Sequence, residues 1–168
     1  ITEATPNYQY VAARLINYKI RKEVYGKFEP DTLEDVIKGN IKRDVYDPAI
    51  LEYYTCEELG ELNNHINHAR DDDFTYVGME QFRSKYLAQY RSTNQLFESS
   101  QILYMMVSAT LFSQEKENRI QLVKDYYDAI SQFYISLPTP IMAGVRTSTR
   151  QFSSCVLIEA GDSLDSIN

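Results

Sequence analysis

The sequence has few cysteines and no long apolar stretch. Its 168 residues include two cysteines, Cys56 and Cys155. Two thiols do not make the disulfide framework that is typical of small secreted domains. Neither a signal peptide nor an apolar segment long enough to cross a membrane is visible. We therefore expect a cytoplasmic protein with no bridge between the two cysteines and no contact with a membrane.

Positive charge is also in short supply. The chain carries 17 Lys and Arg against 24 Asp and Glu, which gives a net charge of −7. This balance argues against a broad surface for DNA or another nucleic acid, so any phosphate must be bound locally. There is no internal repeat, low-complexity tract or linker, and 43% of the residues are hydrophobic. The composition is typical of one domain, or of a large piece of one.

Helical periodicity dominates residues 1–136. Tyr8 to Tyr25 has apolar side chains at Val11, Leu15, Tyr18 and Val24, and Gly26 ends this predicted helix. Thr55 is the predicted cap of another helix that begins near Cys56 and runs to Ala69. The spacing predicts further helices over 31–38, 99–111 and 119–133, another that opens at Asp47-Pro48, and a short helix with a turn or hairpin between 74 and 94. Helical periodicity gives way to loop and strand near Ser136 to Pro138.

Residues 137–168 have a different character. Cys155 to Ile158 is a continuous apolar run, which favours a strand buried on both faces of a parallel sheet or barrel. Arg146 and Arg150 lie shortly before it and could act as charge-assisted donors to phosphate oxygens. Hydroxyl side chains that could do the same are Thr147, Ser148, Thr149, Ser153 and Ser154. A Ser/Thr-rich loop without a ligand is the alternative interpretation.

The stretch from Pro138 to Asn168, PTPIMAGVRTSTRQFSSCVLIEAGDSLDSIN, resembles a known family. It is similar to the first barrel-strand region of the large, catalytic subunit of class I ribonucleotide reductase over about thirty positions. Ser148 stands where the family usually has proline. The resemblance extends upstream to residues 8–15, 25–30, 70–76 and 85–87. It implies a mainly α fold, in which a helical N-terminal region (1–136) leads into the start of a ten-stranded α/β barrel (137–168).

The resemblance assigns roles to three side chains near the predicted strand. Cys155 would be one of two redox thiols that reduce the ribose of a ribonucleoside diphosphate and end as a disulfide. Thr139 and Ser154 match positions that contact the substrate. On the residues alone, a small buried hydrophobe is the favoured interpretation of Cys155, and the surrounding motif favours the redox thiol. Strand alternation would place Ser154 and Cys155 on opposite faces unless the backbone distorts.

Two nucleotide effector sites are also implied by the resemblance. The segment Asp162, Ser163 and Leu164 matches the specificity site, where a deoxynucleoside triphosphate selects the base that is reduced. Asp162 could otherwise be a helix N-cap. Lys22 matches a lysine that contacts ATP at the activity site, beside a regulatory cone that is almost wholly missing from the sequence. A solvated basic helix face is the alternative for Lys22.

The resemblance further implies the partners of the parent protein. These are a small subunit whose metal centre supplies the radical, thioredoxin or glutaredoxin as reductant, and a second large subunit. No cofactor or metal is expected on the residues of this chain. The sequence starts without methionine and stops inside a motif, so we interpret it as a piece of a longer or split protein that is inert alone.

Other functions stay open on the residues alone. A non-catalytic helical nucleotide-binding or assembly module could retain the same motif. Cys155 could also act as a hydrolase nucleophile with His65 or His68. These two histidines and the acidic run at Asp71 to Asp73 could hold a metal, although a pair of helical histidines is a weak indication of one.

Overall fold

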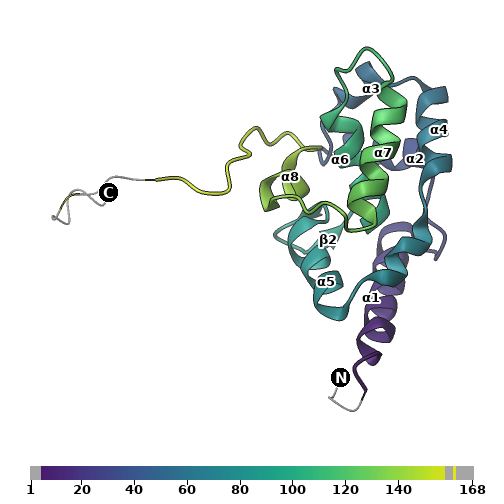
Figure 1. The fold of residues 1–168 in the computed structure, drawn as a ribbon, viewed down its shortest axis with the longest axis vertical. Helices are drawn as coiled ribbons and strands as arrows, with labels where there is room; N and C mark the ends of the chain where they lie inside the picture. The colour runs from purple at the N-terminus through teal and green to yellow at the C-terminus, as the bar shows by residue number, and fades with distance from the viewer. Residues whose placement is uncertain (1–4, 158–160, 162–168) are drawn as a thin grey trace.

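A computed structural model describes residues 5–157 and residue 161, and helices form most of it (Figure 1). The eight α-helices of this described part are α1 (Tyr8–Tyr25), α2 (Leu33–Lys42), α3 (Ile50–Tyr53), α4 (Cys56–His65), α5 (Tyr76–Gln81), α6 (Ser100–Leu111), α7 (Arg119–Ser131) and α8 (Thr139–Gly144). A 3₁₀ helix, η1 (His68–Asp73), and a π-helical turn, η2 (Phe82–Tyr86), flank α5. The mainly helical fold predicted from the sequence is confirmed.

Helix α6 lies at the centre of the core. Every residue from Ser100 to Ala109 is buried, which is the pattern of a helix covered on all sides. Helix α7 packs along it, and α8 and η1 also contact it. The predicted helices over 99–111 and 119–133 are therefore confirmed, with α7 ending at Ser131.

Helix α1 has the predicted bounds, but its buried face differs from the apolar pattern. Gly26 ends the helix with φ of 71°, a left-handed conformation that glycine adopts without strain. The residues of α1 that are buried are Ala13, Asn17 and Ile20. Leu15 is 65% exposed, and Val11 and Tyr18 are also exposed. The sequence correctly predicted a helix but not its orientation, because α5 and η1 select the face they contact.

Two helices that pack against each other, α2 and α4, begin at side-chain caps. The hydroxyl of Thr32 accepts a hydrogen bond from the Asp35 N–H, so α2 begins at Leu33 and not at residue 31, and it continues past Gly39 to Lys42. Thr55 and Glu58 form a capping box that starts α4 at Cys56, as predicted. Helix α4 ends at His65, earlier than predicted, because the chain then turns into η1.

A hairpin follows η2. Strands β1 (Gln89–Tyr90) and β2 (Gln95–Leu96) are antiparallel, with Gln89 opposite Leu96. Its turn falls on residues 91–94, where the sequence predicted a turn or hairpin. Asn94 has φ of 56°, a conformation that asparagine tolerates better than most residues. The hairpin brings the chain back to the start of α6.

Helix α8 was missed, because residues 138–144 were interpreted as a loop. Its sequence contains Pro138, Pro140 and Gly144, which suggest irregular structure. Proline is nevertheless compatible with a first helical turn, where the backbone N–H has no partner within the helix. Pro138 precedes α8 and Pro140 lies in its first turn. Along the part of the chain that the structure describes, no helix has the length and apolar character needed to span a membrane.

We predict that Thr55→Ala will destabilise the folded chain by about 1 kcal/mol, because the capping box loses the hydroxyl that accepts the Glu58 N–H. Thermal and denaturant unfolding measure the change. Ser92→Ala, which deletes a hydroxyl in the exposed hairpin turn, is the matched control and should change stability by less than about 0.5 kcal/mol. Equal effects of the two substitutions would contradict the role of the cap.

Candidate functional site

Three candidate site residues lie on α8 and on the segment that follows it. Thr139 is the first residue of α8, and its side chain is exposed. Ser154 and Cys155 lie on the extended segment that leaves the helical body after α8 (Figure 1), and both are exposed. The Ser154 Oγ lies 3.6 Å from the Cys155 Sγ. The hydroxyl and the thiol are therefore neighbours, and do not point to opposite faces as they would in a regular strand.

The buried strand predicted at Cys155 to Ile158 is not present in the described residues. Residues 151–157 form no strand, and Val156 and Leu157 are 68% and 104% exposed. Ile158 lies outside the described residues. A strand in the interior of a parallel sheet takes hydrogen bonds from a neighbouring strand on each side. Within the described ranges the sheet consists of β1 and β2 alone, and these pair with each other.

Arg146 does not have the role that the sequence suggested. It was a candidate donor to phosphate, but its side chain is fully buried and paired with Glu98. Arg150, the second candidate, pairs with Asp47. Arg146 is therefore a structural cation inside the protein, and a ligand on the surface cannot reach it.

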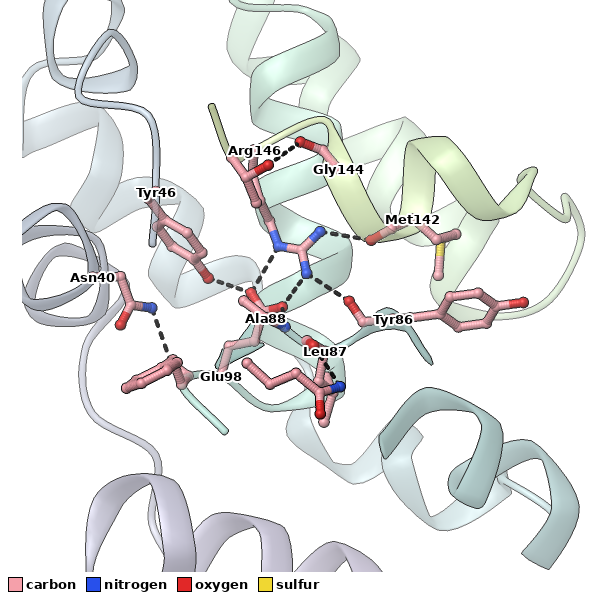
Figure 2. A network of polar contacts seen from close by, with 12 residues as sticks. Asn40, Tyr46, Tyr86, Leu87, Ala88, Glu98, Met142, Gly144 and Arg146 are labelled. Atoms are coloured by element: carbon pink, nitrogen blue, oxygen red, sulfur yellow. Dashed lines mark hydrogen bonds and ion pairs between the residues drawn. The ribbon is translucent and has the colours of Figure 1, made fainter. Parts of the chain in front are cut away.

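Figure 2 shows that the Glu98 carboxylate is the acceptor at the centre of a buried network. One oxygen, Oε2, accepts from the Arg146 Nε at 2.8 Å and from the Tyr46 hydroxyl. The other, Oε1, accepts from the Arg146 Nη2 and, at 2.6 Å, from the Ala88 N–H. Both carboxylate oxygens are thus satisfied, which a buried charge requires.

The same arginine also binds main-chain oxygens of two other segments. Its Nη1 donates to the Met142 carbonyl on α8 at 2.6 Å, and its Nη2 donates to the Tyr86 carbonyl at the end of η2 at 2.9 Å. The Arg146 carbonyl in turn accepts from the Asp47 N–H at 3.0 Å. One side chain and its own backbone therefore tie α8 to η2 and to the loop before α3.

Electrostatics favour the charged state of this pair. Burial opposes the charge on Arg146, but the nearby Glu98 carboxylate outweighs it and raises the pKa of the guanidinium. Burial, together with the charge of Glu98, raises the pKa of Tyr46 well above its usual range, so its hydroxyl stays a donor. Removal of one partner from a buried ion pair typically costs about 3 to 5 kcal/mol, because the remaining charge is left without compensation.

Two further features keep the chain after Arg146 close to the loop before α3 and to α8. Arg150 pairs with Asp47, and the pKa of that carboxyl is lowered by the Ala49 N–H and by Arg150. Gly144 permits a close approach, because a Cβ there would lie 3.3 Å from the Thr149 Cγ2. A side chain at position 144 would press on the segment that leads toward Cys155.

Cys56, the second cysteine, is the first residue of α4 and is exposed and free. Its thiol contacts Glu34, which raises the thiol pKa. A raised pKa leaves less thiolate, the reactive form, at neutral pH. Cys56 is therefore poorly suited to redox chemistry, and it provides a matched control for Cys155.

The predicted effector residues are only partly described. Lys22 is exposed in the last turn of α1, consistent with access by a ligand. Its neighbour Arg21 points inward, where its Nη2 pairs with the buried Asp71 at 2.9 Å. Asp162, Ser163 and Leu164 lie outside the described residues, so their placement stays a prediction.

The two histidines take part in structural contacts. His65 Nε2 lies 3.1 Å from the Asp128 carboxylate on α7. His68 lies in η1, where its main-chain carbonyl accepts from Arg21. No cluster of three His, Cys, Asp or Glu side chains that could hold a metal occurs among residues 5–157. In this described range, the hydrogen bond of the Cys155 thiol goes to Ser154, and no histidine contacts that thiol.

Sequence reasoning missed Glu98 and Tyr46. Glu98 lies between Phe97 and the apolar helix α6, and an isolated carboxylate beside such a run is a signal for a buried charge that needs a partner. Tyr46 carried no comparable signal, because tyrosines occur throughout the chain.

The helical fold and the segment around α8 belong to a known class of protein domain. Residues 72–150 match the family described as the all-alpha domain of ribonucleotide reductase. The match covers α5 to α8 together with the buried Glu98 and Arg146.

Curated relatives extend the similarity to the whole chain. It is 54% identical to the ribonucleoside-diphosphate reductase subunit alpha of Haemophilus influenzae and 53% identical to ribonucleoside-diphosphate reductase 1 subunit alpha of Escherichia coli, over all of this chain and 22% of each relative. The corresponding subunit of Enterobacteria phage T4 is 48% identical, again over all of this chain and 22% of its own length. The chain belongs to the ribonucleotide reductase large-subunit family, and it spans about a fifth of the length of these relatives.

We predict that stability falls as the pH is lowered from about 6.5 to about 4, in part because of His68. Burial lowers the pKa of His68 from 6.5 to about 4, so in this window the unfolded chain binds a proton that the folded chain does not. His68→Gln should therefore make the free energy of unfolding less dependent on pH between these values. Denaturant titrations at several pH values measure the difference.

The buried Asp71 has a raised pKa, and it is present in both the wild type and His68→Gln. Only the difference between their slopes of the free energy of unfolding against pH therefore reports on His68. Identical slopes for wild type and variant would contradict the assignment. At pH 8 the wild-type histidine is neutral in both the folded and the unfolded chain. There, the free energy of unfolding should depend on pH in the same way for wild type and for His68→Gln.

Proposed function

We propose that the chain forms the N-terminal helical region and the start of the catalytic barrel of a ribonucleoside-diphosphate reductase α subunit. The parent enzyme reduces ribonucleoside diphosphates to deoxyribonucleoside diphosphates by radical chemistry. The observation that carries this proposal is the alignment of the entire chain with reductase α subunits, at 54% identity to that of Haemophilus influenzae. The free, exposed thiol of Cys155 supports it.

Cys155 acts as one of two redox thiols. Two thiols supply two electrons and two protons when they form a disulfide. At the ribose, the 2′ C–OH bond breaks, a C–H bond forms, and the oxygen leaves as water. We assign the second thiol, and the cysteine that carries the radical, to parts of the α subunit outside these 168 residues. Thioredoxin or glutaredoxin then reduces the disulfide.

Two hydroxyls orient the substrate beside this thiol. The exposed Thr139, at the start of α8, contacts the diphosphate, and Ser154, next to the thiol, contacts the ribose or the phosphate. A hydroxyl can donate one hydrogen bond and accept others, so it suits both groups. Arg146 contributes no phosphate contact, because Glu98 and main-chain carbonyls occupy its donors.

The proposed regulation and assembly rest on the same membership of the chain in the reductase family. Asp162, Ser163 and Leu164 bind the deoxynucleoside triphosphate that selects the substrate base, and the exposed Lys22 contacts ATP at the activity site. The α subunit pairs with a second copy and receives its radical from the metal centre of a small subunit. The protein works in the cytoplasm and requires neither DNA nor a membrane.

We predict that Cys155→Ser in the complete α subunit, assembled with its small subunit, abolishes reduction of ribonucleoside diphosphates with thiol reductants. Serine cannot form the disulfide, so the two electrons are no longer available. Turnover is measured as deoxyribonucleoside diphosphate formed, and effector affinity should stay within about twofold because no effector residue is changed.

Cys56→Ser is the matched control, because it removes the other exposed thiol of this chain. It should leave turnover close to that of wild type. Retained turnover in Cys155→Ser would overturn the assignment of the redox thiol. The same result would favour a non-catalytic helical module for this part of the subunit.

A further inference from the structure

We propose that Glu98, Arg146 and Tyr46 are positioning residues, which set the place of Thr139 and of the segment that leads to Cys155. This inference rests on the proposed function, since it assigns the network to the substrate site of the reductase. None of the three residues touches substrate. They act through the main chain of α8 and of residues 146–150.

The first step is the contact between the guanidinium and α8. Arg146 donates to the Met142 carbonyl at 2.6 Å, and it is itself fixed by both oxygens of Glu98 (Figure 2). Thr139 precedes Met142 by three residues in the same short helix, so the two lie on neighbouring positions of one helical face. A shift or rotation of α8 at Met142 therefore moves the Thr139 hydroxyl.

The second step concerns the chain beyond Arg146. Its carbonyl accepts from the Asp47 N–H, and Arg150 pairs with the Asp47 side chain. These contacts fix residues 146–150 on the loop before α3. Cys155 lies five residues after Arg150, which limits its distance from that anchor to about 18 Å. The network thus restricts the region that the thiol can reach.

The third step concerns why a buried ion pair, and not an apolar cluster, joins α8 to the helical body. An apolar cluster of similar volume often stabilises a core as well as a buried ion pair does, or better, so stability alone does not explain the pair. A guanidinium differs from an apolar side chain because its planar donors fix direction as well as distance. Here the Arg146 guanidinium donates hydrogen bonds to the Glu98 carboxylate and to the carbonyls of Met142 and Tyr86. This arrangement defines the rotation and position of α8 against the helical body.

The proposal predicts which kinetic constant changes. Glu98→Gln keeps the shape of the side chain but removes its charge, so the guanidinium loses its fixed orientation. Displacement of the Thr139 hydroxyl should raise the KM for a ribonucleoside diphosphate about tenfold. The pair of Arg150 with Asp47 does not involve Glu98 and still anchors the segment that leads to Cys155, so kcat should stay within about threefold of wild type. Tyr46→Phe removes one donor to the same carboxylate and should raise KM about threefold.

A double-mutant cycle separates positioning from general loosening. In the complete α subunit with its small subunit, Thr139→Ala should raise KM by itself. If Glu98 acts through Thr139, Glu98→Gln should add little to KM in the Thr139→Ala background. Asp71→Asn is the matched control, because Asp71 is also a fully buried carboxylate paired with an arginine, but it lies between α1 and α6. It should lower the melting temperature and leave KM unchanged.

The outcomes are distinct. A raised KM for Glu98→Gln that is not additive with Thr139→Ala supports positioning. An unchanged KM, or an effect that is fully additive, overturns it and leaves the proposed function intact. If Glu98→Gln fails to fold, Tyr46→Phe decides by the same cycle. A complete wild-type subunit that does not reduce ribonucleoside diphosphates would refute the proposed function, and the positioning role with it.

Discussion

The structure depends on one buried charge and the groups that satisfy it. Glu98 is fully buried, so its carboxylate oxygens need hydrogen-bond donors from the protein. Arg146, Tyr46 and the Ala88 N–H donate these hydrogen bonds. These donors come from parts of the chain that are far apart in sequence, including the loop before α3, the hairpin and the residues after α8. Because an unpaired buried charge is costly, these segments can dock only in a geometry that brings all the donors to one carboxylate.

A second buried carboxylate, Asp71, applies the same constraint near the start of α6. Asp71 in η1 accepts from Arg21 of α1 and from Gln101 of α6, each at 2.9 Å. Tyr127 of α7 donates to the Gln101 side chain at 2.7 Å. The apolar helix α6 therefore carries polar contacts near its N-terminus that fix α1, η1 and α7 around it. Hydrophobic burial makes the core compact, and these polar contacts specify which face of each element is buried.

Sequence alone predicted the features that depend on neighbouring residues. The bounds of α1, the cap at Thr55 and the helix α6 follow from local signals within a few residues. The fate of Arg146 was not predictable in this way, because its partner Glu98 is separated from it by 48 residues. The same reason explains why the buried face of α1 does not follow its apolar residues, because α5 and η1 contact another face. For α8, prolines that usually indicate a loop occupied the start of a helix.

In the segment with Cys155, the local sequence favours one conformation, but the tertiary contacts decide which conformation forms. Its apolar residues favour a strand, yet Val156 and Leu157 are exposed in an extended segment, because strand formation needs hydrogen bonds from adjacent strands. The start of the segment is fixed differently, by the Arg146 network and by Arg150 with Asp47. The helical body therefore holds the start of this segment in place, although no strand pairs with it in the described residues.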